Sequence, residues 1–369
     1  MRGIAVVGAG GYVGARLVQL AARSGREDVV PVVRGFHSVA RSASLGVRHR
    51  VADVAKPDTL ARAFEGCDAV VNLTTGDPAE IVPTAARLCD AAVAAGARVF
   101  VHLSSATVYG QVETPDLADD APPLRDHWMP YAREKGRAED LLRARMRDAR
   151  TAVVVLRPGL VWGPGSPWVI GPATELVNGS AYLVGDGGGV CDLMYVDDLV
   201  RAIHTVCEAS VAGFYHLADD ETPTWRAYYT ALADGLGVDA GAMHVVPGGR
   251  YRAGLGDRLE TLRSGPAYRW LKERLALETR MALKARLRRA PRAQASGPQV
   301  TRTMWHLQQT RHRRPTKKFH DTFGVGAGTA FSAGMGASLA WLRFIGVDER
   351  DAAAAVGAMG GVERTWTAR

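Results

Sequence analysis

The stretch that decides the fold is Ile4-Ala5-Val6-Val7-Gly8-Ala9-Gly10-Gly11-Tyr12-Val13-Gly14-Ala15-Arg16-Leu17-Val18. An apolar strand runs into a glycine-rich turn, and the turn runs into a helical pattern. Gly8, Gly11 and Gly14 let the backbone approach a pyrophosphate, and the N-terminus of the helix favours its negative charge. A glycine turn between a strand and a helix predicts a dinucleotide-binding unit.

Short apolar runs then alternate with helical patterns, as in a parallel sheet with crossover helices. We expect strands at Ile4–Val7, Val29–Val33, Val47–Val51, Ala69–Leu73, Val99–Leu103 and Ala152–Leu156. We expect helices at Ala15–Ser24, Pro57–Phe64, Ile81–Ala95 and Tyr131–Met146. The fold class is therefore α/β, a doubly wound parallel sheet of the Rossmann type with a cofactor at the carboxyl ends of its strands.

The alternation loosens after Gly163-Pro164-Gly165. We predict a Rossmann domain from residues 1–165 with 195–217, in which Phe214–Leu217 returns to the main sheet. A smaller C-terminal substrate lobe is predicted from residues 166–194, 218–248 and 299–346. A basic helical insertion, with a helix over Tyr268–Arg289, would occupy 249–298, and 347–369 would be a loose tail.

The net charge of +8 is concentrated in one segment. Between Arg250 and His320 there are 19 Lys or Arg and 4 Asp or Glu, a net charge of +15, so the other residues sum to −7. One interpretation is a cap on the substrate lobe with a solvated basic edge. The alternative is peripheral membrane contact through residues 250–320, or a site for an anionic or lipid-linked substrate. No nucleic-acid-binding module accompanies the charge, so no nucleic-acid partner is expected.

The cysteines Cys67, Cys89, Cys191 and Cys207 have no CxxC or Cys/His spacing, so neither a metal site nor a disulfide framework is predicted. No basic segment precedes the first strand, and no apolar run reaches the roughly 18 residues of a membrane span. We expect a cytoplasmic homodimer, with membrane association as the alternative.

Three residues predict proton transfer at a substrate oxygen. Tyr131 and Lys135 are one helical turn apart and share a helix face, and Ser105 lies upstream. A phenol has a reference pKa of about 10, and a nearby ammonium favours the phenolate. A serine hydroxyl can hold the substrate oxygen while the phenol exchanges the proton.

The residues resemble the extended short-chain dehydrogenase/reductases, the nucleotide-sugar epimerase/dehydratase group. The markers are the opening glycine turn, Ser104-Ser105-Ala106-Thr107-Val108-Tyr109-Gly110, Tyr131 with Lys135, Arg157-Pro158-Gly159-Leu160-Val161-Trp162-Gly163-Pro164-Gly165, Tyr195-Val196-Asp197-Asp198 and Thr224-Trp225-Arg226. The resemblance covers Arg2 to about Gly346 apart from the basic insertion.

The resemblance implies roles for these positions. Ser105, Tyr131 and Lys135 would be catalytic, with Lys135 holding the ribose and lowering the pKa of the tyrosine. The implied cofactor-binding residues are Gly8, Gly11, Tyr12, Val13, Gly14, Arg34, Asp53, Val54, Leu73, Thr74, Tyr131, Lys135, Pro158 and Gly159. The implied substrate-binding residues are Thr75, Thr107, Leu160, Trp162, Cys191 and Asp192; no metal is implied.

Arg34 ends the second strand, where family members that use NAD place an acid for the ribose hydroxyls. An arginine there would meet a 2′-phosphate, and Arg41 could assist. We therefore favour NADP over NAD as the cofactor; the alternative is a solvated surface arginine.

The resemblance implies oxidation or reduction of a secondary alcohol or ketone on a sugar or sugar-like substrate. Family dehydratases carry acids after the catalytic serine or threonine, and this chain has Ala106 and Thr107. An epimerase using a transient keto intermediate is therefore expected, and a plain dehydrogenase or reductase is the alternative. Cys191 stands where an arginine usually meets the diphosphate, which puts a nucleotide sugar in doubt. A non-catalytic NADP-binding protein with a basic partner-binding segment is the hypothesis from another class.

Overall fold

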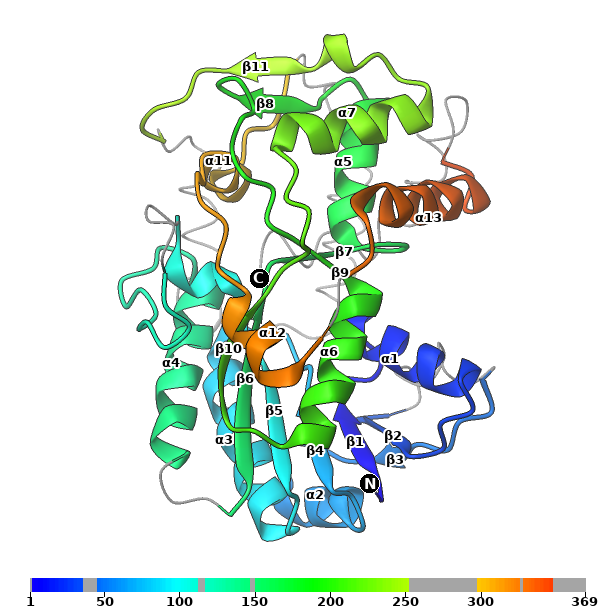
Figure 1. Ribbon diagram of the computed structural model, residues 1–369, viewed down its shortest axis with the longest axis vertical. Helices are drawn as coiled ribbons and strands as arrows, with labels where there is room; N and C mark the ends of the chain where they lie inside the picture. Colours follow the sequence, from blue (N-terminus) through cyan, green and yellow to red (C-terminus); the bar gives the residue numbers. More distant parts are fainter. Residues whose placement is uncertain are drawn as a thin grey trace, which may run out of the picture.

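Parallel strands form the central sheet (Figure 1). They are β1 (Ile4–Val7), β2 (Val29–Val33), β3 (Arg50–Val51), β4 (Ala69–Asn72), β5 (Val99–Leu103), β6 (Ala152–Pro158) and β10 (Gly213–Leu217). Their order in the 7-stranded sheet is β10-β6-β5-β4-β1-β2-β3. The computed structural model describes residues 2–35, 45–111, 117–146, 150–251, 297–325 and 328–347. The predicted doubly wound parallel sheet is confirmed.

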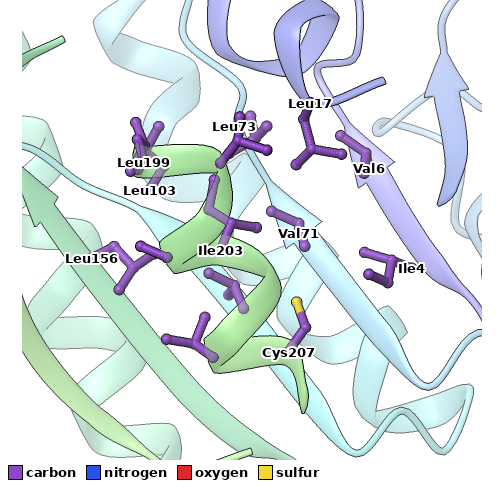
Figure 2. Close-up of a cluster of buried hydrophobic side chains, with 14 of the residues drawn as sticks. Ile4, Val6, Leu17, Val71, Leu73, Leu103, Leu156, Leu199, Ile203 and Cys207 are labelled. Carbon is purple, nitrogen blue, oxygen red and sulfur yellow. The ribbon is translucent and has the colours of Figure 1, made fainter. Parts of the chain in front are cut away.

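Helices cover both faces of this sheet, because strand side chains alternate between the faces. Ile4 and Val6 of β1 pack with α1 (Tyr12–Arg23), α6 (Val196–Ala209) and α12 (Lys317–Phe323). Figure 2 shows Leu199, Ile203 and Cys207 of α6 lying over the strands on this face. The opposite face packs with α2 (Pro57–Phe64), α3 (Pro78–Ala94) and α4 (Pro130–Arg145).

A smaller lobe stands beyond the carboxyl ends of the strands (Figure 1). Its strands pair as β7 (Leu160–Trp162) with β9 (Leu193–Tyr195), and β8 (Tyr182–Val184) with β11 (His244–Val246). Its helices are α5 (Pro167–Val177), α7 (Trp225–Leu236), α11 (Arg302–Leu307) and α13 (Phe331–Phe344). Its core is centred on Trp162, which is 0% exposed and has ring contacts with Tyr195, Tyr228 and Phe331.

Two sequence expectations differ from the structure. The strand expected at Val47–Val51 is only two residues long, since Arg50 and Val51 alone pair with Val32 and Val33 at the sheet edge. Helix α12, expected in the substrate lobe, packs on the main sheet, where Phe319 has its ring centroid 6.1 Å from that of Tyr215.

The helix expected at Tyr268–Arg289 and the tail from residue 348 onward lie outside the described residues. Within the ranges that the structure describes, no helix has both the length and the apolarity to cross a membrane.

Candidate active site

The glycine-rich turn between β1 and α1 is as tight as its sequence predicts. Gly8 has a φ of +92°, and a Cβ there would lie 2.9 Å from the carbonyl of Leu73. A Cβ on Gly14 would lie 2.3 Å from the Gly8 oxygen. Helix α1 begins after Gly11 with no side-chain cap, so its first backbone N–H groups are left for an anion. These residues fit the pyrophosphate of a dinucleotide.

The other residues expected at the cofactor follow the neighbouring strands. Arg34 is exposed directly after β2, while Arg41 lies outside the described residues. Asp53 and Val54 follow β3 and are half-buried, and Asp53 Oδ1 accepts a hydrogen bond from the Ala55 N–H at 3.0 Å.

The fourth strand ends in a small hydrogen-bonded group on the cofactor side. Leu73 is 7% exposed, and the hydroxyl of the next residue, Thr74, donates to Asn72 Oδ1 at 2.6 Å. Asn72 Nδ2 in turn lies 3.0 Å from His102 Nδ1 of β5. Burial and Lys135 lower the pKa of His102, so the ring is neutral. With its amide held from both sides, Asn72 fixes the conformation of Thr74.

Tyr131 and Lys135 lie on one face of α4, which starts at Pro130. Lys135 is 1% exposed, and its Nζ donates to the Leu103 carbonyl at 2.7 Å. Burial lowers the pKa of Lys135 to about 8, and Glu139 opposes this shift. Burial raises the pKa of Tyr131 to about 12, although a hydrogen bond with Ser105 lowers it. Tyr131 is therefore a protonated acid at neutral pH.

Ser105 follows β5 and caps a short 3₁₀ helix, η3 (Ala106–Tyr109). Its Oγ accepts hydrogen bonds from Thr107 Oγ1 at 2.9 Å and from the Thr107 N–H at 3.2 Å. Since both contacts use the lone pairs of Ser105, its own hydrogen is left to donate. Thr107 thus prepares Ser105 as a hydrogen-bond donor.

Ser105 opens into a pocket between the sheet and the smaller lobe. The lining residues are Ser105, Ala106, Thr107, Pro158, Gly159, Leu160, Val190, Asp192, Trp225, Leu307, Thr310 and Arg314. Of the residues expected at the substrate, Thr107, Leu160 and Asp192 line this pocket. Thr75 is exposed after β4, whereas Trp162 and Cys191 are each 0% exposed in the core of the smaller lobe. Pro158 and Gly159, expected beside the nicotinamide, also reach the pocket.

A buried polar network beneath Ser105, Tyr131 and Lys135 was not predicted from the sequence. The side chains of Arg157 and Glu139 are both 0% exposed, and Arg157 Nη2 lies 2.6 Å from Glu139 Oε2. Ser104 donates to the same carboxylate, and Arg157 also donates to Tyr109 and to the Asp119 carbonyl. Glu139 stands eight residues after Tyr131 on the same helix face, and that spacing was the available signal.

The network continues from Tyr109 to the chain segment that carries Arg314. His216 lies 3.0 Å from the Tyr109 hydroxyl through Nε2 and 3.2 Å from the Pro315 carbonyl through Nδ1. A carbonyl only accepts, so Nδ1 carries the hydrogen and Nε2 accepts from Tyr109. Burial lowers the pKa of His216 to about 3, with Arg157 and Arg314 acting in the same direction, which keeps the ring neutral.

Arg314 is the second feature that the sequence did not reveal. It sits in the basic stretch beside Arg311 and Arg313, and nothing local distinguishes it. In the structure its Nη1 lies 2.5 Å from Asp192 Oδ2, and both side chains are buried. Only the tertiary fold brings this arginine to the pocket.

A glycine cradle at the carboxyl ends of the strands of a doubly wound sheet, with a serine, tyrosine and lysine beside it, defines a dinucleotide-dependent oxidoreductase of the extended short-chain type. The sequence profile of the NAD dependent epimerase/dehydratase family matches residues 4–216. The chain belongs to this family, and it is an NAD(P)-dependent enzyme of the extended short-chain dehydrogenase/reductases.

Curated relatives include reductases and dehydratases. A 2-alkyl-3-oxoalkanoate reductase of Stenotrophomonas maltophilia (strain K279a) is 30% identical over 57% of this chain and 66% of its own length. A 3-diazoavenalumate denitrifying reductase of Streptomyces sp is 31% identical over 61% of this chain and 80% of its own. A dTDP-glucose 4,6-dehydratase of Streptomyces antibioticus is 28% identical over 63% of this chain and 77% of its own length.

Solved structures share the fold at low sequence identity. The dTDP-glucose 4,6-dehydratase of Bacillus anthracis str. Ames, in complex with NAD, has a TM-score of 0.68 and 16% identity, covering 93% of this chain and 97% of its own. The UDP-glucuronic acid 4-epimerase of Bacillus cereus, in complex with NAD, has a TM-score of 0.66 and 16% identity. The match covers 92% of this chain and 98% of the epimerase chain.

Replacing Tyr131 with Phe is expected to lower turnover by about 10²–10⁴-fold, because it removes the proton-transfer oxygen and little else. Cofactor affinity, measured by fluorescence titration, should stay close to that of the wild type. Tyr215→Phe is the matched control, since the Tyr215 hydroxyl is outside the pocket lining and its hydrogen bonds to the carbonyls of Val211 and Ala212 are 3.4 Å long. Near-normal activity of Tyr131→Phe would contradict the assignment.

Glu139→Gln is expected to cost about 3–5 kcal/mol in the free energy of unfolding, because it leaves the buried Arg157 charge without its partner. Urea denaturation followed by circular dichroism measures this loss. Glu134→Gln on the same helix is the control, since its pair with Arg137 is partly exposed and should contribute less than about 1 kcal/mol. Equal losses in the two variants would show that the buried pair is not special.

Proposed function

We propose that the chain catalyses the reversible reduction of a ketone to a secondary alcohol with NADP(H). The observation that carries this proposal is the pair of hydrogen-bond donors at the catalytic end of the sheet. Thr107 occupies the lone pairs of Ser105, and burial keeps Tyr131 protonated. Two donors meeting one ketone oxygen stabilise the charge that develops on it, and Tyr131 then supplies the proton.

The bound nicotinamide would supply the hydride that this reaction needs. Lys135 would hold the ribose, and its position next to Thr74 and Leu103 is fixed by the hydrogen bonds to their carbonyls. Gly8, Gly11 and Gly14 would admit the pyrophosphate. After proton donation the Tyr131 phenolate is stabilised by the Lys135 ammonium, whose Nζ lies 5.9 Å from the centroid of the tyrosine ring.

The pocket supports simple redox chemistry over dehydration. Elimination of water needs an additional acid and base at the neighbouring carbon, and Ala106 and Thr107 provide neither. Among the described residues that line the pocket, Asp192 is the one carboxylate, and it is paired with Arg314. A dehydratase of the kind named among the relatives is therefore disfavoured.

The reductase proposal is also preferred over an epimerase. Epimerisation returns hydrogen to the opposite face of the same carbon, so the ketone must turn over while another part of the substrate stays bound. A diphosphate held by free cations would serve that purpose. Arg314 is the one cation among the described lining residues, and Asp192 neutralises it. The family membership nevertheless favours epimerisation as the second candidate.

A deuterium-transfer experiment separates the two reactions. The enzyme is incubated with a panel of cyclic and open-chain ketones and with NADPH carrying deuterium on the transferred position. A reductase consumes the cofactor, seen as a fall in absorbance, and places one deuterium on the alcohol carbon. A parallel incubation with oxidised cofactor and sugars that carry a secondary alcohol tests for an epimerase, which inverts the alcohol without net change in the cofactor. Inversion of a secondary alcohol of an added sugar, while the absorbance of the cofactor stays constant, would overturn the reductase proposal.

The preference for NADP rests on Arg34, which is exposed at the end of β2. If it meets the 2′-phosphate, Arg34→Asp should weaken NADPH binding at least about tenfold, since one hydrogen bond to a charged group is worth about 1.5–3 kcal/mol. NADH binding should change little. Calorimetric titration of both cofactors checks this. The control is Arg23→Asp, because Arg23 is the last residue of α1 and lies at the end of that helix away from the glycine turn. Equal wild-type affinities for the two cofactors would show that Arg34 is a surface residue.

A further inference from the structure

The ion pair of Asp192 and Arg314 lies in the same pocket as Ser105. Asp192 precedes β9, and Arg314 follows α11, so two distant parts of the chain meet here. Arg314 Nη1 donates to Asp192 Oδ2 at 2.5 Å, and the two side chains are 7% and 6% exposed. The pocket therefore contains a cation and an anion that neutralise each other.

Each member of the pair also has one buried atom without a partner in the described structure. These atoms are Asp192 Oδ1, an acceptor, and Arg314 Nε, a donor. A buried polar group is costly to leave unpaired, and the penalty is larger for a charged group. Both residues line the pocket, so a substrate group that reaches the pair would find one acceptor and one donor without partners.

The pair is close to the place where the reaction is expected. A Cβ on Gly159 would lie 2.3 Å from the Asp192 carbonyl oxygen and 3.5 Å from Asp192 Cγ. The Asp192 side chain therefore lies directly against Gly159, which lines the pocket together with Ser105. A substrate whose ketone lies beside Ser105 would therefore occupy the same pocket as the ion pair.

The surrounding structure holds both partners in place. The Leu160 N–H donates to the Asp192 carbonyl at 2.8 Å, and the Val190 N–H donates to the Thr310 carbonyl at 2.7 Å. The Pro315 carbonyl, next to Arg314, accepts from His216. These contacts hold the main chain at or beside both residues, and burial of the two side chains keeps the pair together.

We propose that Asp192 and Arg314 bind a hydroxyl group of the substrate close to the reacting carbon, so that the substrate class is a neutral hydroxyketone. This inference rests on the proposed reductase function. A hydroxyl can accept from Arg314 Nε or donate to Asp192 Oδ1, so it suits either atom of the pair. A carboxylate or phosphate can only accept, and it would bring a second negative charge to the Asp192 carboxylate.

This substrate class differs from that of the relative named for 2-alkyl-3-oxoalkanoates, whose name denotes anionic keto acids. Cys191, beside the pair, adds no charge, because burial and the neighbouring carboxylates raise the pKa of its thiol. The described lining of the pocket has no unneutralised cation to compensate a substrate carboxylate.

The test compares three ketones of matched length: 1-hydroxy-3-octanone, 3-oxooctanoate and 3-octanone. Oxidation of NADPH by the wild-type enzyme is followed for each. The hydroxyketone should have a kcat/KM at least about tenfold above that of 3-octanone, the change expected from one hydrogen bond to a charged group. The keto acid should be no better than 3-octanone.

Asp192→Asn should reverse this preference, because it frees the Arg314 charge for a carboxylate. Arg313→Gln is the matched control and should keep the wild-type order, since Arg313 Nη1 binds the Asp220 carbonyl outside the pocket. If Asp192→Asn does not fold, the order of kcat/KM for the three ketones with the wild-type enzyme decides on the inference by itself. Reduction of 3-octanone as fast as the hydroxyketone, or faster reduction of the keto acid, overturns the inference and leaves the reductase proposal intact. Oxidation of NADPH with none of the three ketones overturns the inference, and the deuterium-transfer panel then decides the reductase proposal.

Discussion

The buried ion pair of Arg157 and Glu139 is the interaction on which the rest of the site depends. Two charges removed from water are costly unless hydrogen bonds satisfy their remaining atoms. Here Ser104, Tyr109 and the Asp119 carbonyl complete the network. Helix α4, strand β6 and the loop after β5 must therefore all take their observed positions together. The pair fixes helix α4, which carries Tyr131 and Lys135, against the loop that carries Ser105.

This network has two consequences for the candidate site. Lys135 lies one helical turn from Glu139, whose negative charge raises the pKa that burial lowers, so the ammonium persists in a buried place. At the other end of the network, Tyr109 and His216 hold the Pro315 carbonyl next to Arg314. The cofactor side and the substrate side are thus positioned by one connected set of neutral and paired groups.

The local part of this architecture could be predicted from sequence. Gly8, Gly11 and Gly14 are constrained by contacts within a few residues or with the adjacent strand, and Tyr131 and Lys135 by helix spacing. The network and Arg314 depend on partners 18 to 122 residues apart in sequence, which no local pattern encodes. The strand expected at Val47–Val51 is shorter in the structure because only Arg50 and Val51 pair with β2, and that pairing depends on where the chain meets the sheet edge.

The same contrast explains why family membership leaves the substrate open. The sheet and the glycine turn present a cofactor in one way, since backbone geometry dictates where a pyrophosphate fits. The substrate pocket is closed by Trp225, Leu307 and Thr310, which come from the smaller lobe and the segment after it. The family profile ends at residue 216, before any of these three. The proposed chemistry at Ser105 and Tyr131 lies at the ends of the sheet strands, whereas the proposed contacts of the substrate with Asp192 and Arg314 depend on the smaller lobe and the segment after it, so the sheet alone does not define the substrate.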